Sequence, residues 1–455
     1  MMFRYATISL LGLMLSIIWL GHAPFLHDFG EWVFQSRILT LHWLNPEEVA
    51  GFQWTGYPVP NILAILIMAV LGLVFSAITA AKIFLSILLT GWYFALQKFV
   101  HQLGNITGSA ALFFVLFSLI GLSNFFWTGF VSYQLGLLLL AVFLTRFGPS
   151  MSAKELAVFA VLIFLSHAMV FLVFMLLVLL EALSTPRRGR WILALFPAGV
   201  LSLWFVIGRS LAAFSAPLAD ASMAGWKEVV IYKLGYPLML GPFKNLLQPD
   251  LSSLVDQLPW LYWMGFVANV LVVSGIVIFI LIVIRPRPGA VPHRVTPAGL
   301  SHRSLRISVW VLLLLYLLAP YNFFGLINPS GRITIPLLMM SLLLAGGTTQ
   351  VASLARILRV LAPVTLVFTF FTVFTYAVLM HRAQAPEYLA SGPEKKSMPD
   401  GVSVLEYNSR IYSQARYNYF NYRIFGFSTR FRDTEIARYN RLGFRTALLV
   451  GYEEP

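Results

Sequence analysis

The chain has 455 residues, of which 59% are hydrophobic, 15% aromatic and only 11% charged. Soluble domains are about 45–50% apolar and about 25% charged, so this composition excludes a soluble enzyme, a disordered chain and a fibrous protein. The mean hydropathy of +0.79 indicates an integral membrane protein with many spans. Because cysteine is absent, disulfides, thiolate catalysis and thiolate metal sites are also excluded.

The formal net charge is +14, from 32 Lys and Arg against 18 Asp and Glu. In a soluble protein this surplus would indicate nucleic-acid binding. In a membrane protein it indicates loops that set topology, so we expect no nucleic-acid partner. The richest basic segments are 187–190, 285–306 and 356–359, and we place them in the cytoplasm together with Arg4.

Apolar stretches of about 20 residues predict membrane-spanning helices, because no unpaired backbone group can face lipid. In chain order the clear candidates are 5–22, 82–101, 108–124, 130–147, 191–209, 259–284, 307–325, 333–350 and 359–380. Two ambiguous regions, 61–79 and 155–184, add two more crossings in either of their assignments, which gives about eleven. We therefore predict an α-helical, multi-pass protein of the cell (inner) membrane, with a cytoplasmic N-terminus and an extracytoplasmic C-terminus.

Two regions leave the topology open. Residues 61–79 either cross the membrane or lie at its outer face as a juxtamembrane helix. Residues 155–184 form either one tilted span or a hairpin of two short helices. The hairpin requires that 61–79 does not cross, and it adds Arg146 and Lys154 to the cytoplasmic charges. We prefer it for that reason.

The chain divides into a transmembrane helical domain, 1–380, and an extracytoplasmic tail, 381–455. Two long outer loops, 23–58 and 210–258, are rich in Trp, Tyr and Pro and contain amphipathic pieces that we expect to lie in the membrane interface. The tail predicts a small α/β module, with strands over 402–407 and 445–450 and a helix over 434–442.

Acidic residues concentrate in the first outer loop, where Asp28 and Glu31 lie among Phe and Trp. A carboxylate that is partly desolvated at the mouth of a span is suited to act as a general base. In the alternative interpretation, Asp28 is the N-cap of the following helix and Glu31 completes a capping box.

Three histidines of the same region, His22, His27 and His42, permit a metal site together with these acids. No H-x3-H or H-E-x-x-H spacing supports a transition metal. A divalent cation held loosely on carboxylates stays possible.

Several polar residues interrupt the apolar segments. Arg332, in the sequence Asn328-Pro329-Ser330-Gly331-Arg332, opens a span on its outer side, where it can bind a phosphate or simply snorkel. Arg209 and Lys82 allow the same interpretation. His167 reaches the outer surface if 155–184 is a hairpin, or it is a neutral histidine bonded to a neighbouring helix. Glu181 lies near Arg187 and Arg188, and we expect an ion pair there.

The order of these features resembles that of the GT-C-type polytopic glycosyltransferases, which take a sugar from a polyprenyl-phosphate carrier on the outer side of the membrane. The residues that carry the resemblance are His27-Asp28 to Glu31, Tyr57-Pro58-Val59-Pro60-Asn61, Ala80-Ala81-Lys82, Phe126-Trp127-Thr128-Gly129-Phe130, Ser166-His167 and Gly331-Arg332, followed by the extracytoplasmic tail.

The resemblance implies that a first-loop acid is the catalytic base or positions the acceptor, and Asp28 matches best. The family often has two adjacent acids, whereas Asp28 and Glu31 are separated by two residues, so either can act. His27, Lys82, His167, Arg209 and Arg332 are the expected substrate-binding residues. The implied partners are a lipid-linked sugar donor, membrane lipids and a lipid or glycan acceptor. The resemblance also implies that 61–79 stays at the outer face.

Two other functions compete with this prediction. A secondary transporter or flippase would place polar groups near the bilayer midplane on broken helices, often in repeated halves, and the sequence has no such repeat. A structural subunit of an envelope assembly would leave the acids idle. No Walker A, Rossmann or G-x-S-x-G motif is present, so ATP-driven pumping and serine hydrolysis have no support.

Overall fold

A computed structural model describes most of the transmembrane part of the chain. The described residues are 2–20, 26, 29–49, 57–103, 109–148, 151–184, 188–213, 230, 233–235, 237, 240–241, 259–284, 299–319, 322–323, 326–327, 329–345, 357 and 360–374. In α2, α10 and α13 several side chains lie outside the description.

The described residues are almost entirely helical. The helices are α1 (Met2–Leu20), α2 (Phe29–Leu44), η1 (Pro46–Val49), α3 (Ile62–Gly72), α4 (Ala77–Gln102), α5 (Ser109–Leu116), the π-helix η2 (Phe117–Gly121), α6 (Asn124–Trp127), α7 (Val131–Arg146), α8 (Ala153–Ser166), α9 (Ala168–Ser184), α10 (Arg188–Ala213), α13 (Pro259–Ile284), α14 (His302–Leu318), α15 (Pro329–Ala345) and a last helix over 360–374. Two short antiparallel strands, β1 (Asn322–Phe323) and β2 (Leu326–Ile327), connect α14 to α15.

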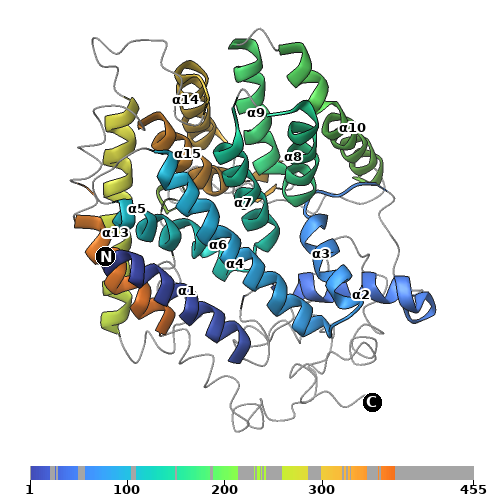
Figure 1. Ribbon diagram of the computed structural model, residues 1–455, viewed down its shortest axis with the longest axis horizontal. Coiled ribbons are helices and arrows are strands. Elements are labelled where there is room, and N and C mark those ends of the chain that lie inside the picture. Colours follow the sequence, from blue (N-terminus) through green and yellow to red (C-terminus); the bar gives the residue numbers. More distant parts are fainter. Residues whose placement is uncertain are drawn as a thin grey trace.

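Helices α7 to α10, α14 and α15 pack together as one group (Figure 1). α8 packs against α7, α9 and α10, and α9 also packs against α14 and α15. α2 packs on α3 and lies across the direction of α9 in the view of Figure 1. Ends of α7, α9 and α15 that are far apart in sequence therefore meet within one bundle.

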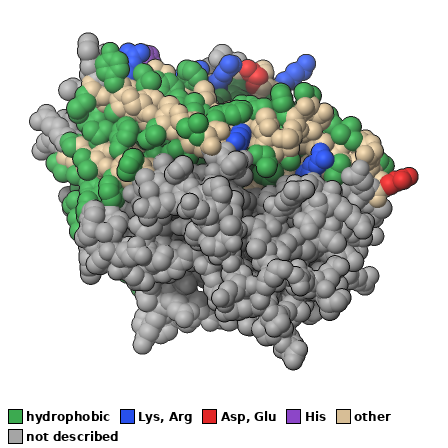
Figure 2. All heavy atoms as spheres, turned by 90° about the horizontal axis from the view of Figure 1, so that it is seen from below, with side chains coloured by type: hydrophobic (Ala, Val, Ile, Leu, Met, Phe, Trp, Pro, Cys, Tyr) green, Lys and Arg blue, Asp and Glu red, His purple; other side chains and the backbone are tan. Residues whose placement is uncertain are grey.

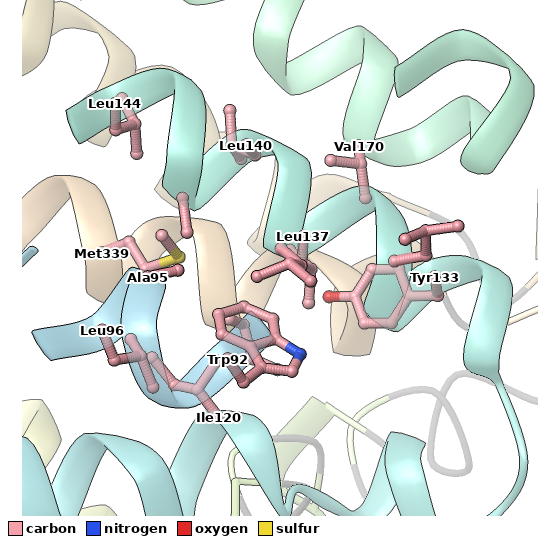
Figure 3. Close-up of a cluster of buried hydrophobic side chains, with 14 of the residues drawn as sticks. Trp92, Ala95, Leu96, Ile120, Tyr133, Leu137, Leu140, Leu144, Val170 and Met339 are labelled. Atoms are coloured by element: carbon pink, nitrogen blue, oxygen red, sulfur yellow. The ribbon is translucent and has the colours of Figure 1, made fainter. Parts of the chain in front are cut away.

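The core is built from large apolar side chains that are almost fully buried. Figure 3 shows Trp92 of α4 among Ile120 of η2, Leu137 of α7 and Met339 of α15, all of them buried. Tyr133 of α7 lies in the same cluster. Burial of such side chains contributes about 1.5–3 kcal/mol each in water. Within a bilayer, close packing between helices takes over that role.

Many apolar side chains nevertheless face outward. Leu193 and Leu203 of α10 are 72% and 61% exposed, and α13 and α14 carry similar residues. Figure 2 shows a face on which the described side chains are mainly hydrophobic, with a few Lys and Arg among them. Exposed apolar surface of this extent is typical of contact with lipid.

Four of the described helical stretches are long and apolar enough to cross a membrane, judged by length and composition: Met2–Leu20, Ala77–Gln102, Ser109–Trp127 and Gly189–Gly208. Six shorter apolar helices accompany them, α7, α9 and α15 included. The protein is thus a helical protein with the features of a membrane protein. The number of crossings and the side on which each terminus lies stay predictions.

The region 155–184 is two helices and not one. α8 ends at Ser166, α9 begins at Ala168, and His167 between them has an extended backbone (φ −167°, ψ 125°). The two helices pack against each other, as the preferred hairpin predicts.

The region 61–79 contains the short helix α3 and the first residues of α4. α3 has 11 residues, which span about 16 Å. The chain then turns over 73–76, and Ser76 caps α4 through a hydrogen bond from the Thr79 N–H to its hydroxyl. Because a hydrocarbon core is about 30 Å thick, α3 alone is too short to cross it.

Other boundaries differ from the sequence expectations. The predicted span 307–325 is α14, which begins earlier, at His302, and ends at Leu318 before the two short strands. The carboxylate of Glu181 accepts a hydrogen bond from the Ser301 backbone N–H at 3.0 Å, so the residue joins α9 to the start of α14. Its expected ion pair and the tail 381–455 lie outside the described residues.

Candidate functional site

His167 occupies the break between α8 and α9 and is only 4% exposed. Its backbone N–H donates to the Ile163 carbonyl as the last helical hydrogen bond of α8, and its extended backbone then ends that helix. Its ring Nδ1 accepts a hydrogen bond from the Met169 backbone N–H at 3.2 Å, in the first turn of α9. A side chain that accepts from the second N–H of a helix is an N-cap. His167 therefore ends one helix and caps the next.

Arg332, in the first turns of α15, meets the other side of the same ring. Its Nη1 lies 3.2 Å from Nε2 of His167. Its guanidinium carbon lies 5.3 Å from the centre of the Phe130 ring, within the range of a cation–π interaction. The structure thus brings together two of the substrate-binding residues that the sequence suggests.

Tyr133 of α7 fixes both partners. Its hydroxyl donates to the Arg332 carbonyl at 2.6 Å, and its ring contacts the His167 ring edge-on, with centroids 5.0 Å apart. One helical turn further along α7, Gly136 leaves room for the hairpin, since a Cβ there would come within 3.3 Å of Cβ of His167. The absence of a side chain at Gly136 thus allows the break between α8 and α9 to pack closely against α7.

Asn61 links the ends of the same helices. Its backbone N–H donates to the Leu165 carbonyl at 3.0 Å, and its carbonyl accepts from the Ser132 hydroxyl at 3.0 Å. Among the described residues it is the one non-glycine residue with a positive φ, 90°. Its buried side-chain oxygen has no hydrogen-bond partner within the described part of the chain. A strained residue with an unpaired polar atom is typical of functional sites.

The electrostatics of this cluster favour an anion. Arg332 forms no ion pair with a carboxylate of the described residues, and its guanidinium lies over the Phe130 ring. The N-terminus of α9 is at His167, and that of α15 is at Pro329, one turn before Arg332. Helix N-termini carry partial positive charge and bind phosphate and carboxylate groups.

Lys82 lies on α4 and contacts the end of α1. Its Nζ is 3.4 Å from the Trp19 carbonyl and 6.0 Å from the centre of the Trp19 ring. Two residues along α4, Phe84 stacks on Phe29 at the start of α2, with centroids 6.5 Å apart. α2 therefore packs against the same helix that carries Lys82.

The remaining predicted site residues are only partly covered. His27 and Asp28 lie outside the described residues. Glu31 is in the first turn of α2 and Arg209 is near the end of α10, but their side chains are not described. α2 is described from Phe29 onward, so the proposed N-cap Asp28 lies just outside the described residues and the capping interpretation stays a prediction.

Metal binding was expected only as a loosely held divalent cation. Within the described ranges no three His, Asp or Glu side chains gather as a metal site. The carboxylate of Asp28 is outside those ranges, so this expectation stays a prediction.

Sequence reasoning missed Tyr133, Phe130 and Asn61 as members of the site, although the segments around Phe130 and Asn61 were noted. The available signals were the glycine at 136, one turn after Tyr133, and the Pro-rich stretch before Asn61. Neither signal predicts which helix ends contact Tyr133 or Asn61, because those contacts depend on tertiary packing.

Comparison of the chain with protein-family models, curated proteins and solved structures finds no match.

Proposed function

We propose that the protein is a GT-C-type glycosyltransferase that transfers a sugar from a polyprenyl-phosphate-linked donor to a lipid or glycan acceptor on the outer face of the cell membrane. The observation that carries the proposal is the partly buried contact between Arg332 and His167, which lies between helix ends and has no carboxylate partner among the described residues. A cation in that setting fits a bound phosphate group, because bidentate arginine–phosphate pairs are strong and directional.

The chemistry needs little else from the protein. An acceptor hydroxyl forms a bond to the anomeric carbon while the bond from that carbon to the phosphate oxygen breaks. The hydroxyl proton goes to a carboxylate, for which Asp28 and Glu31 are the candidates. The polyprenyl phosphate leaves with the electron pair, and Arg332 stabilises the negative charge that develops on it.

The position of the first outer loop supports the assignment of the base. Phe29 lies between Asp28 and Glu31 in sequence, and it stacks on Phe84 of α4. The start of α2, which neighbours both acids in sequence, therefore packs against α4. We place the active site between this loop and the Arg332–His167 pair.

The experiment that tests the base is a comparison of Asp28→Asn and Glu31→Gln. Transfer from purified polyprenyl-linked donors to membrane acceptors is measured for each variant. Loss of transfer in one of them identifies the base, and wild-type transfer in both overturns its assignment. Glu47→Gln is the matched control, since Glu47 is an exposed carboxylate of the same outer loop and should be replaceable.

One observation favours a second candidate, a transporter or flippase for a lipid-linked or amphipathic substrate. Transporters bind anionic groups at the N-termini of broken helices, and α8 and α9 are broken at a buried His167. Purified protein in liposomes separates the two functions. A transporter moves the lipid-linked substrate across the bilayer and forms no new glycosidic bond.

A further inference from the structure

The hydrogen bonds of His167 determine where its ring proton lies. Nδ1 accepts from the Met169 N–H, and a ring nitrogen that accepts a hydrogen bond carries no hydrogen. The neutral ring must then be protonated on Nε2. The positive end of α9 and the adjacent guanidinium of Arg332 both oppose a second proton on the ring.

Nε2–H points toward Arg332, whose Nη1 lies 3.2 Å away. A guanidinium nitrogen is a hydrogen-bond donor and has no acceptor capacity. The Nε2–H of His167 and the Nη1–H of Arg332 are therefore two donors that face each other and cannot form a hydrogen bond. The opposite tautomer would move the conflict to the buried cap of α9, where Nδ1–H would face the Met169 N–H. In the Nε2–H tautomer the two opposed donors are Nε2–H and Nη1–H of Arg332, and an acceptor atom of a bound ligand can accept hydrogen bonds from both.

We infer that His167 is a neutral N–H donor that binds, together with Arg332, an oxygen of the substrate phosphate, and that it is not the proton acceptor of the reaction. This inference rests on the proposed function and deepens it. An anionic oxygen between Nε2–H and Nη1–H turns two opposed donors into two hydrogen bonds. The acceptor hydroxyl must then lose its proton to another group, for which Asp28 and Glu31 are the proposed candidates.

Two substitutions separate the two roles of the ring. In His167→Asn the side-chain oxygen can still accept from the Met169 N–H, because Asn is among the best N-cap residues, but the donor at the Nε2 position is lost. In His167→Gln the longer side chain can place an amide N–H near that position. We expect geranyl phosphate to bind His167→Asn about tenfold more weakly than wild type. His167→Gln should retain more of the affinity.

Binding is measured by calorimetry on the full-length protein in detergent, with thermal unfolding as the check on folding. Weaker binding by His167→Asn at an unchanged unfolding temperature supports the inference, because loss of a purely structural residue would lower that temperature. Wild-type affinity in His167→Asn overturns it.

The tautomer can be observed directly by 15N NMR of protein labelled at histidine. The chain has 8 histidines, and the signals lost in His167→Asn identify those of His167. We expect a protonated Nε2 and an unprotonated Nδ1 at neutral pH, with and without geranyl phosphate. A proton on Nδ1, or on both nitrogens, contradicts the inference. If the tautomer and the binding are as expected but no sugar is transferred, the proposed function fails and the donor role stands.

Discussion

Nη1 of Arg332 lies 3.2 Å from Nε2 of His167, although 165 positions separate the two residues in the chain. The contact joins the start of α15 to the break between α8 and α9. Tyr133 of α7 touches both residues, so three segments of the bundle converge on one cationic point. Substitutions that shift any of these helices should therefore change the positions of His167 and Arg332.

Removal of the Tyr133 hydroxyl tests this convergence. Tyr133→Phe leaves the Arg332 carbonyl without its 2.6 Å hydrogen bond in a buried position. We expect a loss of about 1–3 kcal/mol in the free energy of unfolding, together with weaker binding of geranyl phosphate. The control is Tyr93→Phe, because Tyr93 makes ring contacts with Phe113 and Phe94 that survive the change. Equal losses in both variants would show that the hydroxyl of Tyr133 has no special role.

The close approach of α7 to the hairpin gives a second prediction. In Gly136→Ala the new methyl group would lie 3.3 Å from both Cβ of His167 and Cγ2 of Val170. We expect destabilisation by about 1–3 kcal/mol and displacement of His167. Gly199→Ala on α10 is the comparison, because no atom lies within 4 Å of the added methyl group, and it should be neutral or slightly stabilising. Thermal unfolding in detergent measures both, and a neutral Gly136→Ala would contradict the described packing.

The capping box of α8 predicts a dependence of stability on pH. Hydrogen bonds to the Glu155 carboxylate from Ser152, the backbone N–H first and then the side-chain hydroxyl, lower the pKa of Glu155. A carboxyl whose pKa is lower in the folded state stabilises the fold above its unfolded pKa, and this contribution disappears as the pH falls through the folded pKa. Between about pH 6 and about pH 3 the unfolding temperature of wild type should therefore fall more than that of Glu155→Gln. Parallel curves for the two proteins would show that the cap does not act through the ionised carboxylate.

The topology can be tested because the chain contains no cysteine. Under the preferred hairpin, the exposed Ser109 at the start of α5 faces the cytoplasm, and Glu47 faces outward. In intact cells an impermeant maleimide should label Glu47→Cys and leave Ser109→Cys unlabelled until the membrane is opened. Labelling of Ser109→Cys from outside would favour the rival assignment, in which 61–79 crosses.

Much of the helix pattern follows from the sequence alone, because lipid restricts a spanning segment to helix. The stretch 259–284 coincides with α13, and the break at His167 agrees with the preferred reading of an apolar block too long for one span. The start of α14 was missed because its first turns are polar. Ser301 caps it by accepting from the Ser304 N–H, and the helix therefore begins before the apolar run.

The candidate site was less predictable. His167 and Arg332 could each be selected as polar residues in apolar surroundings, but their contact depends on how α15 packs against α9. The roles of Tyr133 and Asn61 depend on backbone carbonyls, Arg332 O and Leu165 O, which no side-chain pattern reveals. The identity of a hydrogen-bond partner 199 positions away is a property of the fold and not of the local sequence.

The rate of sugar transfer by purified protein in proteoliposomes, compared between wild type and Arg332→Ala, tests the central claim most directly. The donors are a set of polyprenyl-phosphate-linked hexoses and pentoses. We predict transfer by wild type and a rate about 100-fold lower in Arg332→Ala, because the charge on the departing phosphate loses its main stabilising group. Equal rates in the two proteins, or movement of the donor across the bilayer without any transfer by wild type, would contradict the account.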